Sequence, residues 1–164
     1  MSVADAARAR VARWRHWAVA LAAVLAIVLG APARARDPAE LVAFARARAL
    51  ADIDGFIATL RGLAEDGRLP ARFVTKAEAE RRGWRPGRDL CEVAPGRALG
   101  GDRFANREGR LPADSGRLWR EADLDFACGR RGPRRLVWSS DGLFFVTLDH
   151  YRTFVRVPPP RAPP

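Results

Sequence analysis

Two side chains in the second half of the chain could act together as a base and an acid. Glu121 lies in a predicted strand near residues 118–126, and His150 lies at the end of a later one that finishes at Tyr151. A carboxylate that faces an imidazole across a groove can take a proton from a nucleophile and return one to a leaving group. Because a carboxylate on a strand is more often an ordinary surface group, assigning a catalytic role to this pair requires further evidence from other residues.

Three cations could complete such a site by binding an anionic group between the acid and the base. They are Lys76, Arg131 and Arg135. Lys76 is the only lysine among 29 cationic side chains. An ammonium is a compact point charge and a guanidinium is a planar fork, so a lone lysine is a candidate for a role that arginine cannot fill. Compositional drift is the alternative interpretation.

The elements before residue 95 are predicted to be helical. Apolar residues recur at helical spacing within 37–66. Thr75 and Glu78 have the spacing of a capping box, which predicts a short helix that ends near Gly83. Lys76 then lies in the first helical turn, where the helix dipole does not favour a cation.

After Pro95, turns rich in glycine and aspartate separate short apolar runs. Asp141-Gly142 between two such runs predicts a β-hairpin. Helices followed by an antiparallel meander indicate an α+β domain, with N-terminal helices packed on a C-terminal antiparallel sheet. The proline-rich segment from Val157 onward is expected to be extended and unpacked. Strands are predicted near residues 98–104, 118–126, 134–140, 142–149 and 153–157.

Residues 1–35 have the pattern of a signal peptide. Several arginines precede an apolar run over 17–31, and small residues follow it at a predicted cleavage site. An apolar run of about 15 residues is shorter than the roughly 20 that span a bilayer. We therefore expect a secreted protein with no stable membrane association after cleavage. An uncleaved anchor is the alternative.

Cleavage would leave an N-terminal extension (36–51), one domain (52–157) and a tail (158–164). Five arginines and one acidic residue leave with the signal, so the formal charge falls from +10 to +6. A basic product suits a polyanionic partner, such as nucleic acid, an acidic protein or a membrane surface.

The mature part keeps two cysteines, Cys91 and Cys128. An even number of cysteines in an oxidising destination favours one disulfide. If the chain is never exported, two buried thiols become the better interpretation.

A series of short motifs also runs along the chain from Leu69 to Val157. In content and order they resemble the barnase-type guanyl-specific microbial ribonucleases. The motifs are Leu69-Pro70, Val74-Thr75-Lys76, Gly83-Trp84, Val93-Ala94-Pro95-Gly96, Gly100-Gly101-Asp102, Phe104, Asn106-Arg107-Glu108-Gly109, Leu111-Pro112, Ser115-Gly116-Arg117, Trp119-Arg120-Glu121-Ala122-Asp123, Ser139-Ser140-Asp141 and Asp149-His150-Tyr151.

The resemblance implies a role for each candidate residue. Glu121 matches the general base and His150 the general acid of that family. The three cations named above match residues that contact phosphate, and Asp102 matches an acid that helps to hold the cationic site together. The remaining matches belong to base recognition: Tyr151 as an aromatic beside the base pocket, and the loop of Phe104, Asn106, Arg107 and Glu108, with Glu108 as the carboxylate that accepts from guanine.

The implied activity is guanyl-preferring cleavage of RNA through a 2′,3′-cyclic phosphate. No metal or other cofactor is expected, because RNA carries its own nucleophile, the 2′-hydroxyl. The resemblance further implies a monomer that a barstar-like acidic protein could inhibit. Two alternatives remain, namely a binding module that holds RNA or an acidic protein without turnover, and a ribonuclease toxin delivered to competing cells.

Overall fold

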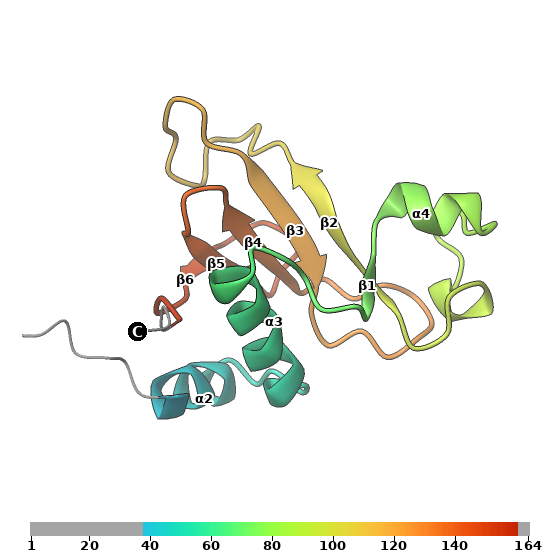
Figure 1. The fold of residues 1–164 in the computed structure, drawn as a ribbon, viewed down its shortest axis with the longest axis horizontal. Helices are drawn as coiled ribbons and strands as arrows, with labels where there is room; N and C mark the ends of the chain where they lie inside the picture. The colour runs from blue at the N-terminus through green and yellow to red at the C-terminus, as the bar shows by residue number, and fades with distance from the viewer. Residues whose placement is uncertain (1–37, 161–164) are drawn as a thin grey trace, which may run out of the picture. The chain divides into compact units, whose positions relative to one another are not determined.

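The computed structural model describes residues 38–160, which form several helices and a six-stranded sheet (Figure 1). The strand order is β1 to β6 along the chain; β1 and β2 are parallel and all other neighbours are antiparallel. This arrangement confirms the predicted α+β class. The elements are α2 (Pro38–Ala47), α3 (Ile53–Glu65), β1 (Phe73–Val74), α4 (Lys76–Arg81), a 3₁₀ helix η1 (Leu90–Glu92), β2 (Ala98–Phe104), β3 (Trp119–Asp123), β4 (Arg135–Ser139), β5 (Phe144–Thr147) and β6 (Val155–Arg156).

The helical pattern over 37–66 forms two helices rather than the continuous region that was predicted. Ala49 has a left-handed backbone (φ 48°), which ends α2, and Asp52 caps α3. Asp125, far along the chain, accepts hydrogen bonds from the backbone N–H groups of Ala51 and Asp52, each at 3.0 Å. A tertiary contact that local spacing could not reveal therefore holds this break.

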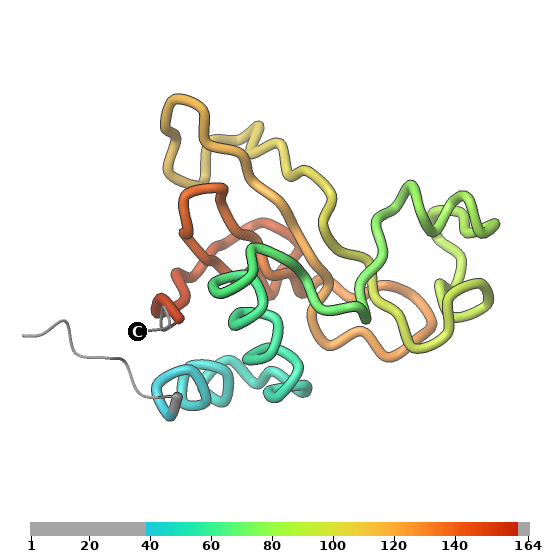
Figure 2. Tube along the Cα trace, viewed as in Figure 1, coloured from blue at the N-terminus to red at the C-terminus, as the bar shows by residue number. Residues whose placement is uncertain are grey.

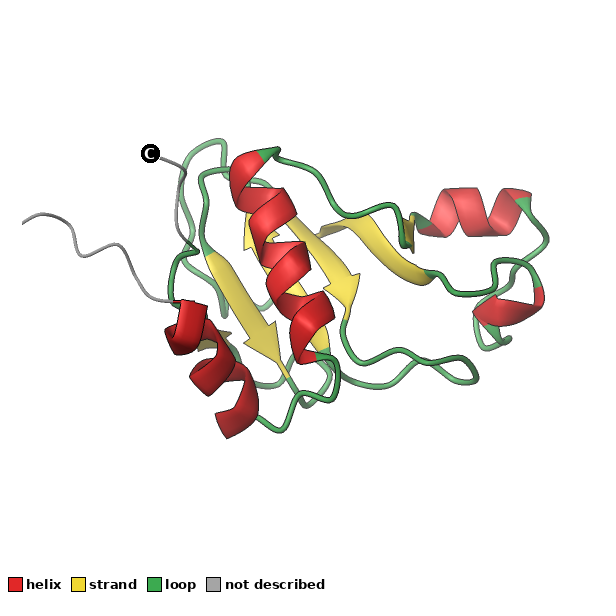
Figure 3. Cartoon of the chain, turned by 60° about the horizontal axis from the view of Figure 1, so that its bottom comes forward, coloured by secondary structure: helices red, strands yellow, loops and turns green. Residues whose placement is uncertain are grey.

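The helices α2 and α3 cover one face of the sheet, as Figure 3 shows. Leu41 and Phe44 of α2 and Phe56 and Leu60 of α3 are buried in the same apolar cluster. Residues 38–51, the described part of the predicted extension that had no assigned task, thus contribute to the main core. The strands supply the other side of this cluster through Ala122, Leu136, Trp138, Phe144 and Val146.

Side chains that alternate with these point to the opposite face of the sheet. A smaller apolar cluster, which includes Leu111, Trp119 and Val137, covers part of that face. Glu121 and Asp123 follow Trp119 at intervals of two residues in β3, so they lie on the same face, away from α3. These two carboxylates therefore lie on the face of the sheet that α2 and α3 do not cover.

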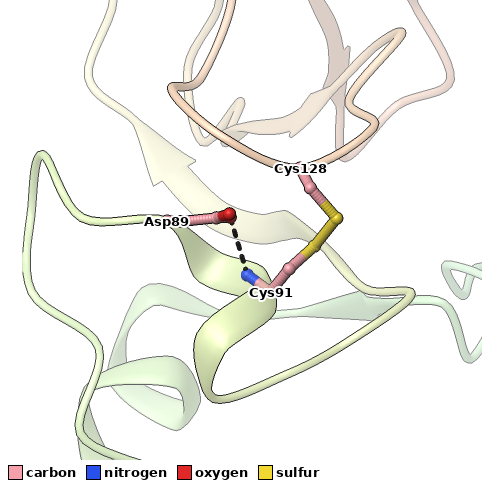
Figure 4. A group of neighbouring side chains, drawn as sticks. All are labelled: Asp89, Cys91 and Cys128. Carbon is pink, nitrogen blue, oxygen red and sulfur yellow. Dashed lines mark hydrogen bonds between the residues drawn. A yellow bond between two sulfur atoms is a disulfide. The ribbon is translucent and has the colours of Figure 1, made fainter.

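A third apolar cluster joins α4 and η1 to the first strands, and a disulfide connects it to the rest of the sheet. Cys91 in η1 and Cys128 in the loop after β3 are bonded, with their Cα atoms 5.5 Å apart (Figure 4). The predicted disulfide is confirmed. Asp89 lies beside it, but its carboxylate accepts the Cys91 N–H, and bonded sulfurs are not available as thiolate ligands for a metal.

Two expectations about the last third of the chain were wrong. β5 ends at Thr147, so His150 lies in the following turn and not in a strand. Val157 is 1% exposed and its N–H donates to the carbonyl of Phe144, so the segment that was expected to be unpacked begins with a buried residue. The predicted hairpin at Asp141-Gly142 is present between β4 and β5.

The predicted signal peptide and residues 161–164 lie outside the described residues. Within residues 38–160, no helix has both the length and the apolar character to cross a membrane.

Candidate active site

The position of Lys76 is set by the predicted capping box. The Thr75 hydroxyl accepts the Glu78 N–H at 3.2 Å, and the Glu78 carboxylate accepts the Thr75 N–H at 2.7 Å. These bonds start α4 at Lys76. Its backbone N–H donates to Asp102 in β2 at 3.0 Å, which fixes the start of the helix beside the sheet.

A bulge in β2 places two carboxylates opposite each other. The register shifts between Gly100 and Asp102, where Gly101 has a left-handed backbone (φ 94°), and Asp102 then pairs with Glu121 of β3. Like charges directly opposite on two strands repel each other. Lys76 relieves this repulsion, because its backbone N–H binds Asp102 and its Nζ lies 2.8 Å from Glu121 Oε1.

Glu121 is almost enclosed, with 8% of its side chain exposed. Its second oxygen, Oε2, accepts the hydroxyl of Tyr151 at 2.6 Å. Burial raises the pKa of Glu121, but the hydrogen bonds from Lys76 and Tyr151 and the positive charges outweigh it, so the pKa lies below its ordinary value. The carboxylate is therefore ionised at neutral pH and able to accept a proton.

Tyr151 acts as a hydrogen-bond donor over the whole physiological range. Burial, followed by the hydrogen bond to Glu121, raises the pKa of Tyr151 to about 12. Its ring stacks on Phe104, with the ring centres 5.3 Å apart. Tyr151 thus connects the carboxylate to an aromatic surface at the end of β2.

Asp123 holds the other two predicted cations. Arg131 binds it in a bidentate manner, with Nε and Nη2 at 2.8 and 2.6 Å from its oxygens. Arg135, directly opposite Asp123 in the β3–β4 register, lies 2.9 Å away through Nε and is 3% exposed. Asp123 was not among the predicted site residues, although its spacing of two residues from Glu121 was an available signal.

His150 is presented by a turn that Asp149 stabilises. His150 and Tyr151 both have left-handed backbones (φ 59° and 70°). Asp149 accepts from the Thr153 hydroxyl at 2.7 Å and from the Thr153 N–H at 2.9 Å, and these bonds lower the pKa of Asp149 to about 2. The His150 N–H donates to the carbonyl of Pro133. The imidazole and Tyr151 ring centres lie 5.0 Å apart.

The loop after Phe104 is shaped by Asn106. Its side-chain amide donates to the carbonyl of Leu111 at 2.9 Å and accepts the Leu111 N–H at 3.0 Å, so it closes residues 106–111 into a compact turn. Arg107 and Glu108 are exposed, and Glu108 pairs with Arg110 at 3.7 Å. Their side chains therefore lie at the solvent-exposed edge of the site, whereas the Phe104 ring connects the loop to the site by stacking on Tyr151.

The structure thus brings most of the candidate residues into one cluster. Glu121 contacts Lys76 and Tyr151 directly, and His150 lies beside Tyr151. Arg135 lies 5.9 Å from the Tyr151 ring centre. An ionised carboxylate and an imidazole among cations can move protons at a phosphate, whose charge the cations neutralise.

Comparisons with known proteins agree with this chemistry. The chain is 54% identical over 91 residues to a ribonuclease of Heyndrickxia coagulans, a match that covers 55% of this chain and 84% of the relative. It is 50% identical over 109 residues to ribonucleases of Bacillus intermedius and Bacillus pumilus, covering 66% of this chain and 67% of each relative. A family model described as ribonuclease matches residues 61–158. With this match over more than half of its length, the chain belongs to the barnase-type microbial ribonuclease family.

Proposed function

We propose that this ribonuclease is a guanyl-preferring endonuclease of single-stranded RNA. It acts by transesterification to a 2′,3′-cyclic phosphate, which it then hydrolyses. The observation that carries the proposal is the state of Glu121, a carboxylate that two donors keep ionised inside a cluster that also presents an imidazole.

In the first step Glu121 takes the proton of the 2′-hydroxyl as O2′ attacks phosphorus. His150 protonates O5′ as the P–O5′ bond breaks, so the chain is cut and a cyclic phosphate remains. In the second step the roles reverse, and His150 takes a proton from water while Glu121 returns one to O2′. The reacting hydroxyl belongs to RNA and is absent from DNA, which makes the reaction selective for RNA.

The cations stabilise the charge that develops on the phosphoryl oxygens. Lys76 is 38% exposed at its side chain and can reach a ligand while it remains near Glu121. Arg131 is 22% exposed, whereas Arg135 is buried against Asp123. We therefore assign direct phosphate contact to Lys76 and Arg131, and assign Arg135 to the support of the site through Asp123 and the Tyr151 ring.

Guanine preference follows from the loop after Phe104. Guanine presents two N–H donors beside an acceptor oxygen, which suits one carboxylate and neighbouring backbone amides. Glu108 is exposed at the rim and can exchange its weak pairing with Arg110 for such a base. The Phe104 ring, stacked on Tyr151, offers an apolar surface close by.

Two further proposals concern where the enzyme acts. Export by the predicted signal peptide would keep it away from the RNA of its own cell. The cationic site would also attract an acidic inhibitor protein that binds in place of RNA. A toxin role has the same chemistry, and identifying the cells that the secreted protein enters would separate it from the scavenging of nucleotides.

Digestion of dinucleotides tests the proposed reaction. Purified enzyme in excess EDTA should convert GpU to 2′,3′-cyclic GMP and uridine, and should cleave ApU much more slowly. Glu108→Gln should lose most of this preference while still cleaving both substrates. A lack of cyclic product would refute the mechanism, and a binding module without turnover would release no uridine. Loss of activity in EDTA that Mg²⁺ restores would refute metal independence.

A second prediction concerns the pH dependence of cleavage. Tyr151→Phe keeps the ring beside Phe104 but removes the hydroxyl that donates to Glu121, so the pKa of Glu121 should rise. The base must be ionised to act. The acidic limb of kcat/KM against pH should therefore move to higher pH. An unchanged limb, measured with GpU, would show that Glu121 is not the group that this limb reports.

A further inference from the structure

The loop of residues 124–134, here called the Arg131 loop, contributes Arg131 and the carbonyl of Pro133 to the site. The Leu124 N–H donates to the carbonyl of Arg134 at 3.1 Å and closes its base. Asp125 also pairs with Arg134 at 2.6 Å. The base of the loop is therefore well anchored to the sheet.

The tip of the Arg131 loop has few other attachments. Within the described part of the chain, residues 127–131 make no backbone–backbone hydrogen bonds. Cys128 is exposed and has a left-handed backbone (φ 92°). The tip is attached to the rest of the domain by the Arg131–Asp123 ion pair and, covalently, by the disulfide to Cys91. Figure 2 shows that the loop runs beside the segment that contains η1.

The Cys91 end of the disulfide belongs to a packed segment. Leu90, next to Cys91, is 1% exposed in the apolar cluster that joins η1 to α4 and the first strands. The Asp89 carboxylate fixes the Cys91 N–H at 2.9 Å (Figure 4). The disulfide thus ties the tip of the loop to the same packed unit whose helix begins at Lys76.

Two groups of the active site depend on where this loop lies. Arg131 extends from it to Asp123, and the carbonyl of Pro133 accepts the backbone N–H of His150 at 3.2 Å. A small displacement of the loop would move the Arg131 guanidinium first, because Arg131 belongs to the poorly attached tip. His150 is also held by its own turn.

We propose that the Cys91–Cys128 disulfide is a positioning element that holds Arg131 at the scissile phosphate. Opening it by a dithiol slows catalysis without unfolding the domain. In that reaction the S–S bond accepts two electrons and two protons and becomes two thiols, while the dithiol closes to a cyclic disulfide. The inference rests on the proposed role of Arg131. Reduction of this disulfide would make the enzyme slower in a reducing compartment than in an oxidising one.

A double-mutant cycle tests this coupling. Removing the disulfide, by Cys91→Ser with Cys128→Ser, should lower kcat for GpU about tenfold and leave KM nearly unchanged. Arg131→Ala should cost about 100-fold in the disulfide-bonded enzyme. In the disulfide-free enzyme, Arg131→Ala should lower kcat by only about a further tenfold, because Arg131 is already displaced there.

Matched controls separate positioning from general loss of stability. Lys76→Ala should cost the same factor in both backgrounds, since Lys76 is held by Asp102 and the capping box. Leu41→Ala destabilises the core on the other face of the sheet and should leave kcat unchanged well below its melting temperature. Wild-type enzyme treated with dithiothreitol should match the double serine variant, with native circular dichroism in both.

The outcomes are distinct. If Arg131→Ala costs the same factor with and without the disulfide, or if kcat does not change when the disulfide is removed, the proposal is overturned and the proposed reaction stands. If Arg131→Ala has no effect even in the disulfide-bonded enzyme, the assignment of Arg131 to phosphate binding also fails.

Discussion

Glu121→Gln should lower kcat/KM for GpU by about 1,000-fold, in line with the loss of a general base. The amide has nearly the same shape, but its one oxygen can keep only one of the two hydrogen bonds, either that from Lys76 at Oε1 or that from Tyr151 at Oε2. It cannot take the proton of the 2′-hydroxyl. Glu92→Gln makes the same chemical change at an exposed ion pair with Arg88 and should leave the rate unaltered. Retained activity in Glu121→Gln would remove Glu121 from the mechanism.

The same variant should change stability in a pH-dependent way. Because the pKa of Glu121 is lower in the folded protein than in the unfolded chain, its ionised form stabilises the fold above the unfolded pKa. That contribution is lost as the pH falls through the lower, folded pKa. Denaturant titrations should therefore show Glu121→Gln less stable than wild type at neutral pH, with the difference narrowing in acid.

His150→Asn should also lower kcat for GpU by about 1,000-fold, because an alkoxide leaves poorly without a proton. Asparagine tolerates the left-handed backbone at this position better than most residues, so the turn at Asp149 should persist. A guanosine 3′-(4-nitrophenyl phosphate) substrate, whose leaving group needs no proton, should be affected far less. Glu121→Gln should be slow on both substrates.

Equal losses of His150→Asn on the two substrates would show that His150 does not act as the general acid. Circular dichroism and the melting temperature of each variant establish that the fold is intact. The two predictions together distinguish the base from the acid, since only the effect of the acid depends on the leaving group.

Local patterns in the sequence predicted much of this architecture. The capping box at Thr75 and Glu78, the hairpin at Asp141-Gly142 and the apolar face of α3 each depend on residues within a few positions of one another. Local geometry is set by neighbouring residues, so such features can be inferred without knowing the fold. The motif order also identified the family, and with it the candidates for each role.

Other features depend on contacts between distant residues. The break between α2 and α3 is held by Asp125, which lies more than 70 positions along the chain. The shared use of Asp123 by Arg131 and Arg135 follows from the β3–β4 register, and the turn at His150 follows from side-chain bonds of Asp149. Secondary-structure propensity and the spacing of neighbouring residues do not reveal which distant residues will pair.

The sequence by itself thus determined the α+β class, the family and the identity of the residues that could do chemistry. Only the tertiary structure decided how those residues act on one another. Lys76 and Glu121 are 45 positions apart, and their ion pair exists because a bulge and the strand register bring α4 to β3. The pKa of Glu121 depends on burial and on donors from two other segments, and both are properties of the folded chain alone.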